Sequence, residues 1–182
     1  KPMITTEFGY TDCNVANPVG EMTPERKAAF LVRGLVIQHV LGFRRVFVYS
    51  FWDEGEDPNY TEHAFGLVDY KLQKKPAYFA SQVLGRELGD CVYDSKMKGA
   101  DEVNSGYVYR NPETDRFVTV VWNGASGMAG TFRSQPGTVI VTAMTGGKKE
   151  VKTAPDGSFR ALYGPAPVYL ESAAPVELVK TA

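Results

Sequence analysis

Two acidic stretches could carry chemistry because each follows directly on a run of strand-forming residues. Glu7 follows Met3–Thr6 and stands two residues before Gly9, and the segment 52–54 (Trp-Asp-Glu) follows the run 45–51. In parallel βα folds, ligands bind where strands end and loops begin, so both stretches are candidates for one site. A carboxylate at the end of a buried strand is held rigidly, and a nearby glycine leaves room for a ligand. From position alone, a glutamate that caps a loop by binding backbone N–H groups or an arginine explains Glu7 equally well.

Other polar side chains in the same loops are candidates for binding a ligand. Tyr10 and Tyr49 could flank the site, although packing roles are equally favoured. Asp53 and Glu54 belong to an acidic run that could bind ligand hydroxyls or a cation, although a solvated charge run is the favoured interpretation. His63 lies in the loop after the second strand and could touch a ligand, although a role without ligand contact is favoured.

A strand–helix–strand–helix order is predicted to position these residues. Thr23 is a good N-cap and Pro24 suits the first helical position, so a helix is predicted to run to the stop signal Gly42. The uninterrupted apolar core of the strand 45–51 predicts burial on both faces, as in a parallel sheet. A second helix is predicted over 75–88. Two βα units with about 42 residues from strand to strand are typical of a (β/α)8 TIM barrel.

The second half of the chain has a different pattern, with short β-rich runs separated by turn signals such as Asn123-Gly124 and Asp156-Gly157. Regularly spaced short strands predict an antiparallel β-sandwich. The sequence therefore predicts an α/β domain over 1–92, the last two βα units of a barrel, and an all-β domain over 93–182. The predicted strands of the second domain cover 106–109, 116–122, 130–133, 138–142, 149–152, 158–162 and 167–170.

The predicted first domain has a physical problem, because two βα units cannot close a barrel. Their strands would expose long apolar edges, which favour aggregation. The chain is therefore expected to be the C-terminal part of a longer protein, with the remainder of the barrel N-terminal to residue 1. A second chain that completes the sheet is a less favoured alternative. A free-standing interaction module is a third, and the exposed strand edges argue against it.

The composition excludes several classes of partner. The formal net charge is -1, which argues against nucleic acid or an anionic membrane surface, since both require a basic excess. Hydrophobic residues make up 43% of the chain, enough for a core, but no apolar run approaches the length of a membrane span. No cofactor is predicted, and a catalytic metal is not expected because the chain has 2 histidines and no paired cysteine ligands. Cys13 and Cys91 are predicted to be two unpaired thiols.

Three segments, taken in order, resemble the last two βα units of a clan A retaining glycoside hydrolase, with families 39 and 5 the nearest likeness. They are ITTEFGY, YSFWDEG and AFGLVDYKLQKKPAYFA, which occupy 4–10, 49–55 and 64–80. A C-terminal β-sandwich with a Pro-Val-Tyr strand, like that at 166–169, also recurs in such enzymes. The resemblance implies part of a TIM barrel followed by a β-sandwich, a carbohydrate substrate, and an extracellular or periplasmic location.

The resemblance also implies roles for the candidate residues. Glu7 would be the nucleophile of a retaining mechanism, which hydrolyses an O-glycosyl bond through a covalent glycosyl-enzyme. Trp52 would stack on the sugar ring, with a core tryptophan as the alternative. The acid/base glutamate of such enzymes comes from the fourth strand, so it is missing from this chain and the isolated chain is expected to be inactive. The other residues proposed to bind carbohydrate are Tyr10, Asp53, Glu54 and His63.

Two alternatives are open on the sequence alone. The chain could belong to a non-catalytic carbohydrate-binding protein with a degenerate barrel. In the second half, Trp122 and the tyrosines at 107, 109 and 169 could form a carbohydrate-binding face, although a role in the sheet core is favoured.

Overall fold

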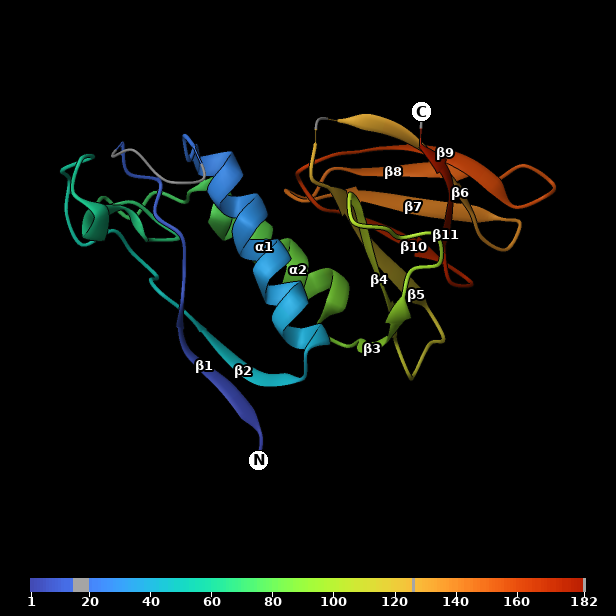
Figure 1. The fold of residues 1–182 in the computed structure, drawn as a ribbon, viewed down its shortest axis with the longest axis horizontal. Coiled ribbons are helices and arrows are strands. Elements are labelled where there is room, and N and C mark those ends of the chain that lie inside the picture. Colours follow the sequence, from blue (N-terminus) through green and yellow to red (C-terminus); the bar gives the residue numbers. More distant parts are fainter. Residues whose placement is uncertain (15–19, 126, 182) are drawn as a thin grey trace. The chain divides into compact units, whose positions relative to one another are not determined.

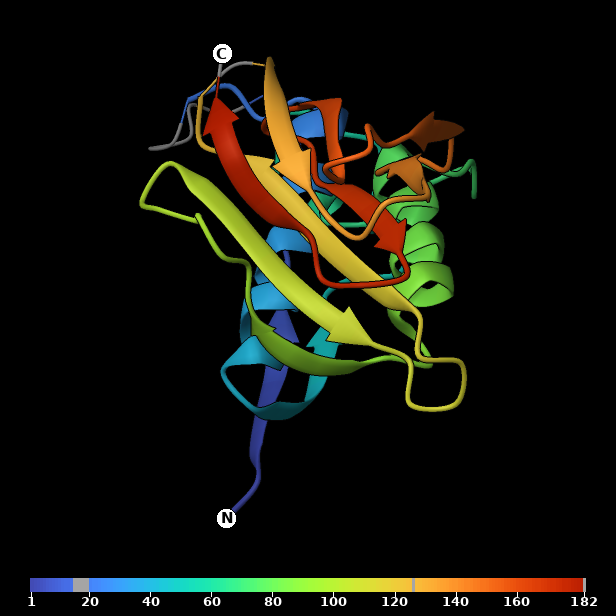
Figure 2. The same cartoon turned by 90° about the vertical axis from the view of Figure 1, so that its right-hand side faces the viewer.

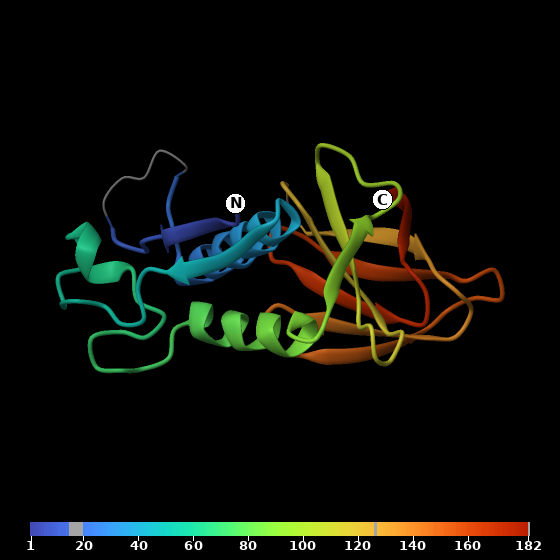
Figure 3. The same ribbon diagram turned by 90° about the horizontal axis from the view of Figure 1, so that it is seen from below.

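The computed structural model describes residues 1–14, 20–125 and 127–181 (Figure 1). It divides into two compact units, Lys1–Gln82 and Val83–Ala182. The last turns of α2 (Pro76–Leu88) belong to the second unit, and this helix leads into β3 (Val92–Lys96; Figure 3).

The first unit begins with a parallel strand pair. β1 (Met3–Phe8) lies beside β2 (Phe43–Val48), and α1 (Pro24–Val40) connects them (Figure 1). This order is the one that the sequence predicts, although β2 begins and ends earlier than expected. The loop after β2 contains one short 3₁₀ helix, η1 (Thr61–Ala64).

Helix α1 has the boundaries that its capping residues predict. The Thr23 hydroxyl accepts a hydrogen bond from the Arg26 backbone N–H at 3.2 Å, which satisfies one of the unpaired donors of the first turn. Gly42 follows the C-terminal end with a φ of +84°, a conformation that favours glycine. The buried face of the helix includes Ala28, Ala29, Leu31, Val32 and Val36.

The strands of this unit are not buried on both faces, so that prediction is wrong for the described chain. Met3 is 46% exposed, Ile4 48% and Phe47 55%. The reason is that the first unit forms a sheet of two strands within the described residues, which leaves apolar side chains and both outer edges without neighbours.

The second unit is a sandwich of two antiparallel sheets (Figure 2). Its remaining strands are β4 (Asn104–Arg110), β5 (Phe117–Asn123), β6 (Met128–Arg133), β7 (Thr138–Ala143), β8 (Lys148–Lys152), β9 (Ser158–Tyr163), β10 (Val168–Ser172) and β11 (Glu177–Thr181). The larger sheet has the order β3-β4-β5-β10-β7-β8, and the smaller sheet has the order β11-β6-β9. The predicted sandwich is therefore confirmed.

The core of the sandwich is made by the inward residues of both sheets. The rings of Phe132 and Phe159 stack with centroids 5.7 Å apart on the smaller sheet, and Val121 and Leu170 face them from the larger sheet. The buried cluster consists of Met97, Val108, Val121, Phe132, Val139, Phe159, Ala161, Tyr163, Leu170, Val176 and Leu178.

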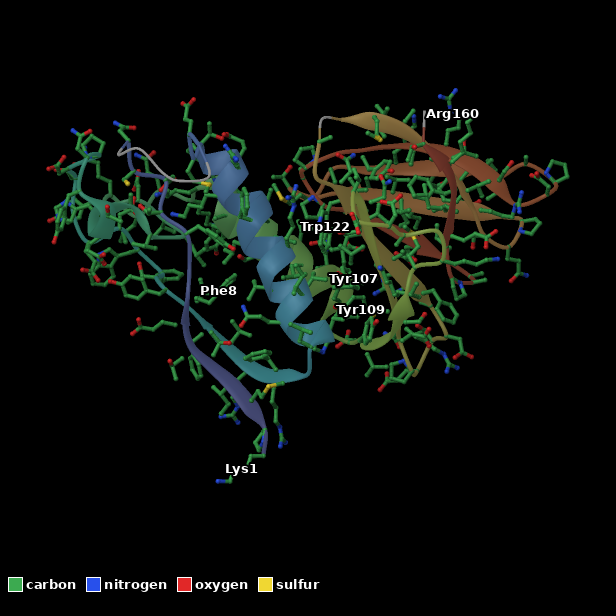
Figure 4. The ribbon with its side chains drawn as sticks, viewed as in Figure 1. Lys1, Phe8, Tyr107, Tyr109, Trp122 and Arg160 are labelled. Atoms are coloured by element: carbon green, nitrogen blue, oxygen red, sulfur yellow. The ribbon has the colours of Figure 1, made fainter. Side chains whose placement is uncertain are left out.

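The proposed aromatic carbohydrate-binding face of the sandwich is not exposed. Tyr107 and Trp122 lie on the neighbouring strands β4 and β5, with ring centroids 5.4 Å apart (Figure 4). Trp122 is only 5% exposed, and Tyr109 and Tyr169 are fully buried. The favoured interpretation of these side chains as part of the packed sheet is confirmed.

Tyr163→Phe is expected to destabilise the second unit by about 1–2 kcal/mol, because the Tyr163 hydroxyl donates a buried hydrogen bond to Asn104 Oδ1 at 2.6 Å. Tyr169→Phe is the matched control, since the buried Tyr169 hydroxyl has no hydrogen-bond partner among the described residues. Its removal should leave stability unchanged or slightly higher. Urea unfolding, followed by pulsed hydrogen exchange of peptides from 83–182, measures both effects. Equal losses in the two variants would contradict the prediction.

Candidate functional site

Glu7 lies at a solvent-open hollow near the carboxyl end of the β1–β2 pair. The hollow has a volume of about 360 Å³ and is lined by Glu7, Phe8, Gly9, Tyr49, Glu62 and Phe65. Glu7 is the penultimate residue of β1 and is exposed. Among the described residues, no hydrogen bond or ion pair engages its carboxylate, so the alternative of a loop-capping glutamate finds no support.

The backbone on either side of Glu7 is held by close contacts. The Tyr49 N–H donates to the Phe8 carbonyl at 2.9 Å, which joins the ends of the two strands. A Cβ added at Gly9 would lie 1.8 Å from the Tyr49 oxygen, and one added at Gly34 would lie 2.1 Å from the Phe8 ring. Both glycines are therefore required by the close approach of neighbouring groups, which fixes the strand that carries Glu7.

The Tyr49 hydroxyl lies between two carboxylates. It is 3.0 Å from Glu54 Oε1 and 3.3 Å from Glu62 Oε2. The hydrogen bond to Glu54 is the main cause that raises the pKa of Tyr49 to about 12, so the phenol is a donor at neutral pH. Because a phenol has one proton, it cannot donate fully to both carboxylates at once. This leaves acceptor capacity beside the hollow for the hydroxyl of a ligand.

The segment that carries Phe65 is hydrogen-bonded to the residues that directly follow β2. The Leu67 N–H donates to the Ser50 carbonyl at 3.1 Å, and the Val68 N–H donates to the Phe51 carbonyl at 3.0 Å. The Phe65 ring packs edge-on against Tyr49, with centroids 5.3 Å apart. η1 precedes this segment and brings Glu62 into the lining of the same hollow.

Lys27 belongs to α1 and anchors this segment to the helix. Its side chain is 2% exposed, and its Nζ donates to the carbonyl oxygens of Ala64 at 2.7 Å and Gly66 at 2.8 Å. The third partner is Asp12 Oδ1 at 3.1 Å, so the ammonium group has one acceptor for each of its three protons. Residues 64 and 66 flank Phe65, and Lys27 thereby fixes the wall that Phe65 contributes to the Glu7 hollow.

Lys75 and Asp53 complete a group that we call the buried charge cluster: Asp12, Lys27, Asp53 and Lys75. Lys75 Nζ lies 2.8 Å from Asp12 Oδ1 and 2.9 Å from Asp53 Oδ2. Burial opposes the charge on Lys75, but its bonds to Asp12 and Asp53 outweigh that effect and raise the pKa of Lys75. Asp53 Oδ1 also accepts from the Gly66 N–H at 2.7 Å. The cluster therefore ties together the loops that follow β1 and β2.

Lys27 gives the stability of the first unit a defined dependence on pH. Burial lowers the pKa of Lys27 from 10.5 to about 8, against the opposing effect of Asp12. Between these two values the unfolded chain binds more protons than the folded chain, so stability rises with pH by up to about 1.4 kcal/mol per pH unit.

We therefore expect the stability of the wild type relative to Lys27→Met to increase between pH 8 and pH 10. Urea unfolding at several pH values, read out on peptides from residues 1–82, measures this difference. A wild-type advantage that stays flat or falls over this range would exclude the proposed burial of the charged amine.

None of the five predicted binding residues belongs to the lining of the Glu7 hollow, and three of them have other surroundings. The Tyr10 ring packs against Phe30 with centroids 5.4 Å apart, and burial raises the pKa of Tyr10. Asp53 is 7% exposed and belongs to the buried charge cluster. His63 accepts the Asp57 N–H at Nδ1 (3.2 Å) and lines a second hollow instead.

The remaining two predicted residues differ in their relation to Glu7. Trp52 is 54% exposed but does not line the hollow, whereas Glu54 borders it through its bond to Tyr49. The sequence predicted no site role for Glu62 or Phe65, although Phe65 lies in one of the three segments that carry the resemblance. Both lie in a polar loop where no periodic pattern marks them, and only the turn at η1 brings them to the end of β1.

The second hollow, of about 270 Å³, lies over the buried charge cluster and is mainly acidic. No group of His, Cys, Asp and Glu within the described ranges has an arrangement that could hold a metal ion. Among the described helices, none has the length and apolar character needed to cross a membrane. Within the described residues, neither Cys13 nor Cys91 forms a disulfide, which agrees with the sequence-based prediction.

Comparison with known proteins places the fold among glycoside hydrolases. A family 39 glycoside hydrolase from the gut symbiont Bacteroides cellulosilyticus superimposes with a TM-score of 0.78 at 21% identity, over 93% of this chain and 33% of its own. A GH30 endoxylanase from Clostridium papyrosolvens gives a TM-score of 0.56 at 13% identity, over 98% of this chain and 42% of its own. A glucosidase from Croceicoccus marinus gives a TM-score of 0.57 at 12% identity, over 99% of this chain and 46% of its own.

The TM-scores show a common fold, and the resemblance to clan A glycoside hydrolases is confirmed at the level of the fold. The chain spans between a third and just under half of the length of these proteins. No family model matches the sequence. No curated protein matches it at a significant level.

Proposed function

We propose that this chain is the C-terminal part of a retaining glycoside hydrolase and that Glu7 is its nucleophile. The observation that carries the proposal is the unpaired Glu7 carboxylate, open to a hollow at the carboxyl end of a parallel strand. The fold shared with three glycoside hydrolases supports it. The substrate is a poly- or oligosaccharide, and the sandwich is an accessory domain.

In this proposal, Glu7 attacks the anomeric carbon while a general acid protonates the departing glycosidic oxygen. The bond that forms joins the sugar to the Glu7 carboxylate, and the bond that breaks is the glycosidic one. Water then attacks the same carbon, gives its proton to the acid/base residue and releases Glu7. The acid/base carboxyl belongs to the rest of the barrel, about 5–5.5 Å from Glu7.

The rest of the barrel is proposed to pack on the exposed faces and edges of β1 and β2. Met3, Ile4 and Phe47 are each about half exposed. Their burial by further βα units would stabilise the first unit by about 25 cal/mol for each Å² of apolar surface covered. The same packing would place the missing acid/base residue opposite Glu7.

Covalent trapping tests the proposal, in a protein where the preceding βα units accompany this chain. Dinitrophenyl 2-fluoro-glycosides of xylose and glucose slow the hydrolysis of a glycosyl-enzyme, so they should leave a sugar on the peptide that spans 4–10. Mass spectrometry identifies the modified residue, and Glu7→Gln is expected to stay unmodified. A label on another carboxylate would overturn the assignment of Glu7. Carbohydrate binding without any label or turnover would instead favour the non-catalytic binding protein.

A further inference from the structure

We propose that the Glu7 hollow accepts neutral sugars and rejects sugars that carry a carboxylate, and that Glu62 sets this preference. The inference rests on the proposed function, since it concerns the substrate class of the same site. It depends on three observations: the charges in the lining are all negative, the nearby lysines already have other partners, and the Tyr49 hydroxyl has a single proton to donate.

The charges that this chain contributes to the hollow have one sign. Glu7 and Glu62 both belong to its lining, and no Lys, Arg or His is among the described lining residues. Glu54 adds a third carboxylate, 3.0 Å from the Tyr49 hydroxyl that borders the hollow. A ligand carboxylate in this position would meet like charges, with no cation among the described lining residues to offset them.

Three lysines near these loops are held by acidic partners. Lys27 and Lys75 are held by the aspartates of the buried charge cluster. Lys71 pairs with Glu56 at 2.9 Å and lines the second hollow. Lys74 lies over the Tyr78 ring, 4.7 Å from its centroid. None of these four cations can turn toward Glu7 without giving up its present contact.

Glu62 is also suited to recognise a neutral hydroxyl. The Tyr49 proton has its shorter bond to Glu54, at 3.0 Å, and its longer one to Glu62, at 3.3 Å. Glu62 therefore has acceptor capacity directed at the hollow, and a carboxylate can accept bonds only from groups that carry a proton. Sugar hydroxyls supply such protons, whereas an ionised sugar carboxylate supplies none. Hydrogen bonds from sugar hydroxyls and the repulsion of a ligand carboxylate thus both favour a neutral sugar.

The test compares two non-hydrolysable ligands, phenyl thioglucoside and phenyl thioglucuronide, by titration calorimetry on the barrel-complete protein. We expect the neutral ligand to bind at least about tenfold more tightly, a difference that shrinks at high salt. Glu62→Gln keeps the size of the side chain but removes its charge, and should reduce the preference several-fold. Glu25→Gln is the matched control, because Glu25 is exposed and lines neither hollow, and it should leave the preference unchanged.

Equal or tighter binding of the thioglucuronide would overturn the inference, and so would the absence of binding of either ligand at millimolar concentration. If Glu62→Gln keeps the wild-type preference for the thioglucoside, Glu62 does not set that preference. These results are separable from the proposed function. Trapping at Glu7 with preferred binding of thioglucuronide refutes only the substrate class, whereas preferred binding of thioglucoside without trapping refutes only the nucleophile.

Discussion

Replacing Glu7 by glutamine in the barrel-complete protein is expected to lower turnover at least about a thousandfold while carbohydrate binding is retained. The amide keeps the shape of the side chain but is a poor nucleophile, so the covalent step should fail. Among the described residues the Glu7 side chain has no structural partner to lose, and the fold should not change. Steady-state kinetics and calorimetry with the thioglucoside separate the two effects.

A second variant distinguishes a nucleophile from a residue that acts only through structure. Glu7→Ala opens space beside the anomeric carbon, and added azide should restore turnover as a glycosyl azide of inverted anomeric configuration. Glu102→Gln is a suitable control, since this exposed glutamate lies in the second unit. Retention of more than about a tenth of wild-type turnover by Glu7→Gln would exclude Glu7 as the nucleophile.

Lys27→Met is expected to destabilise the first unit by about 3 kcal/mol at pH 7. The methionine fills a similar volume but donates no hydrogen bond. The carbonyls of Ala64 and Gly66 therefore lose a buried donor, and Asp12 keeps only Lys75. Urea unfolding with pulsed hydrogen exchange of peptides from 1–82 measures the loss separately from the second unit.

Lys71→Met provides the matched control for this prediction. Lys71 also forms an ion pair, with Glu56 at 2.9 Å, but its side chain is 70% exposed. Exposed pairs contribute little because water solvates both partners, so the control should unfold at the wild-type urea concentration. If the two variants unfold alike, the cluster does not anchor the loops. Faster exchange around Phe65 in Lys27→Met alone would confirm that Lys27 holds this wall of the hollow.

Local signals account for the parts of the fold that were predicted correctly. The boundaries of α1 follow from Thr23, Pro24 and Gly42, whose effects are confined to one helical turn. Each of the seven predicted strands of the sandwich is present, because each alternates or clusters β-branched residues between turn signals. The two strands that were missed, β3 and β11, are edge strands, as are β8 and β9, which were predicted. The turn signals Gly146-Gly147 and Asp156-Gly157 directly precede β8 and β9, and no such pair directly precedes β3 or β11.

The amino-acid sequence by itself determined the order of the elements and the candidate nucleophile. Glu7 at the end of a β-branched run, before a glycine, is a short-range feature that needs no knowledge of the rest of the chain. The same holds for the resemblance carried by the three ordered segments, which the common fold confirms. Within the described chain, the apolar character of β1 and β2 did not lead to burial, because burial depends on neighbouring strands.

Only the tertiary structure decided which other residues share the hollow with Glu7. Glu62 and Phe65 reach it through η1 and the backbone hydrogen bonds that Leu67 and Val68 donate to the chain after β2. Asp53 is instead held in the buried charge cluster by Lys75. Trp52, Asp53 and Glu54 are consecutive in the sequence, but their side chains lie in different surroundings. Trp52 is exposed, Asp53 pairs with Lys75, and Glu54 accepts a hydrogen bond from Tyr49. The physical reason is that side chains on an extended chain diverge within one residue, so contacts formed far along the sequence determine which of them face the site.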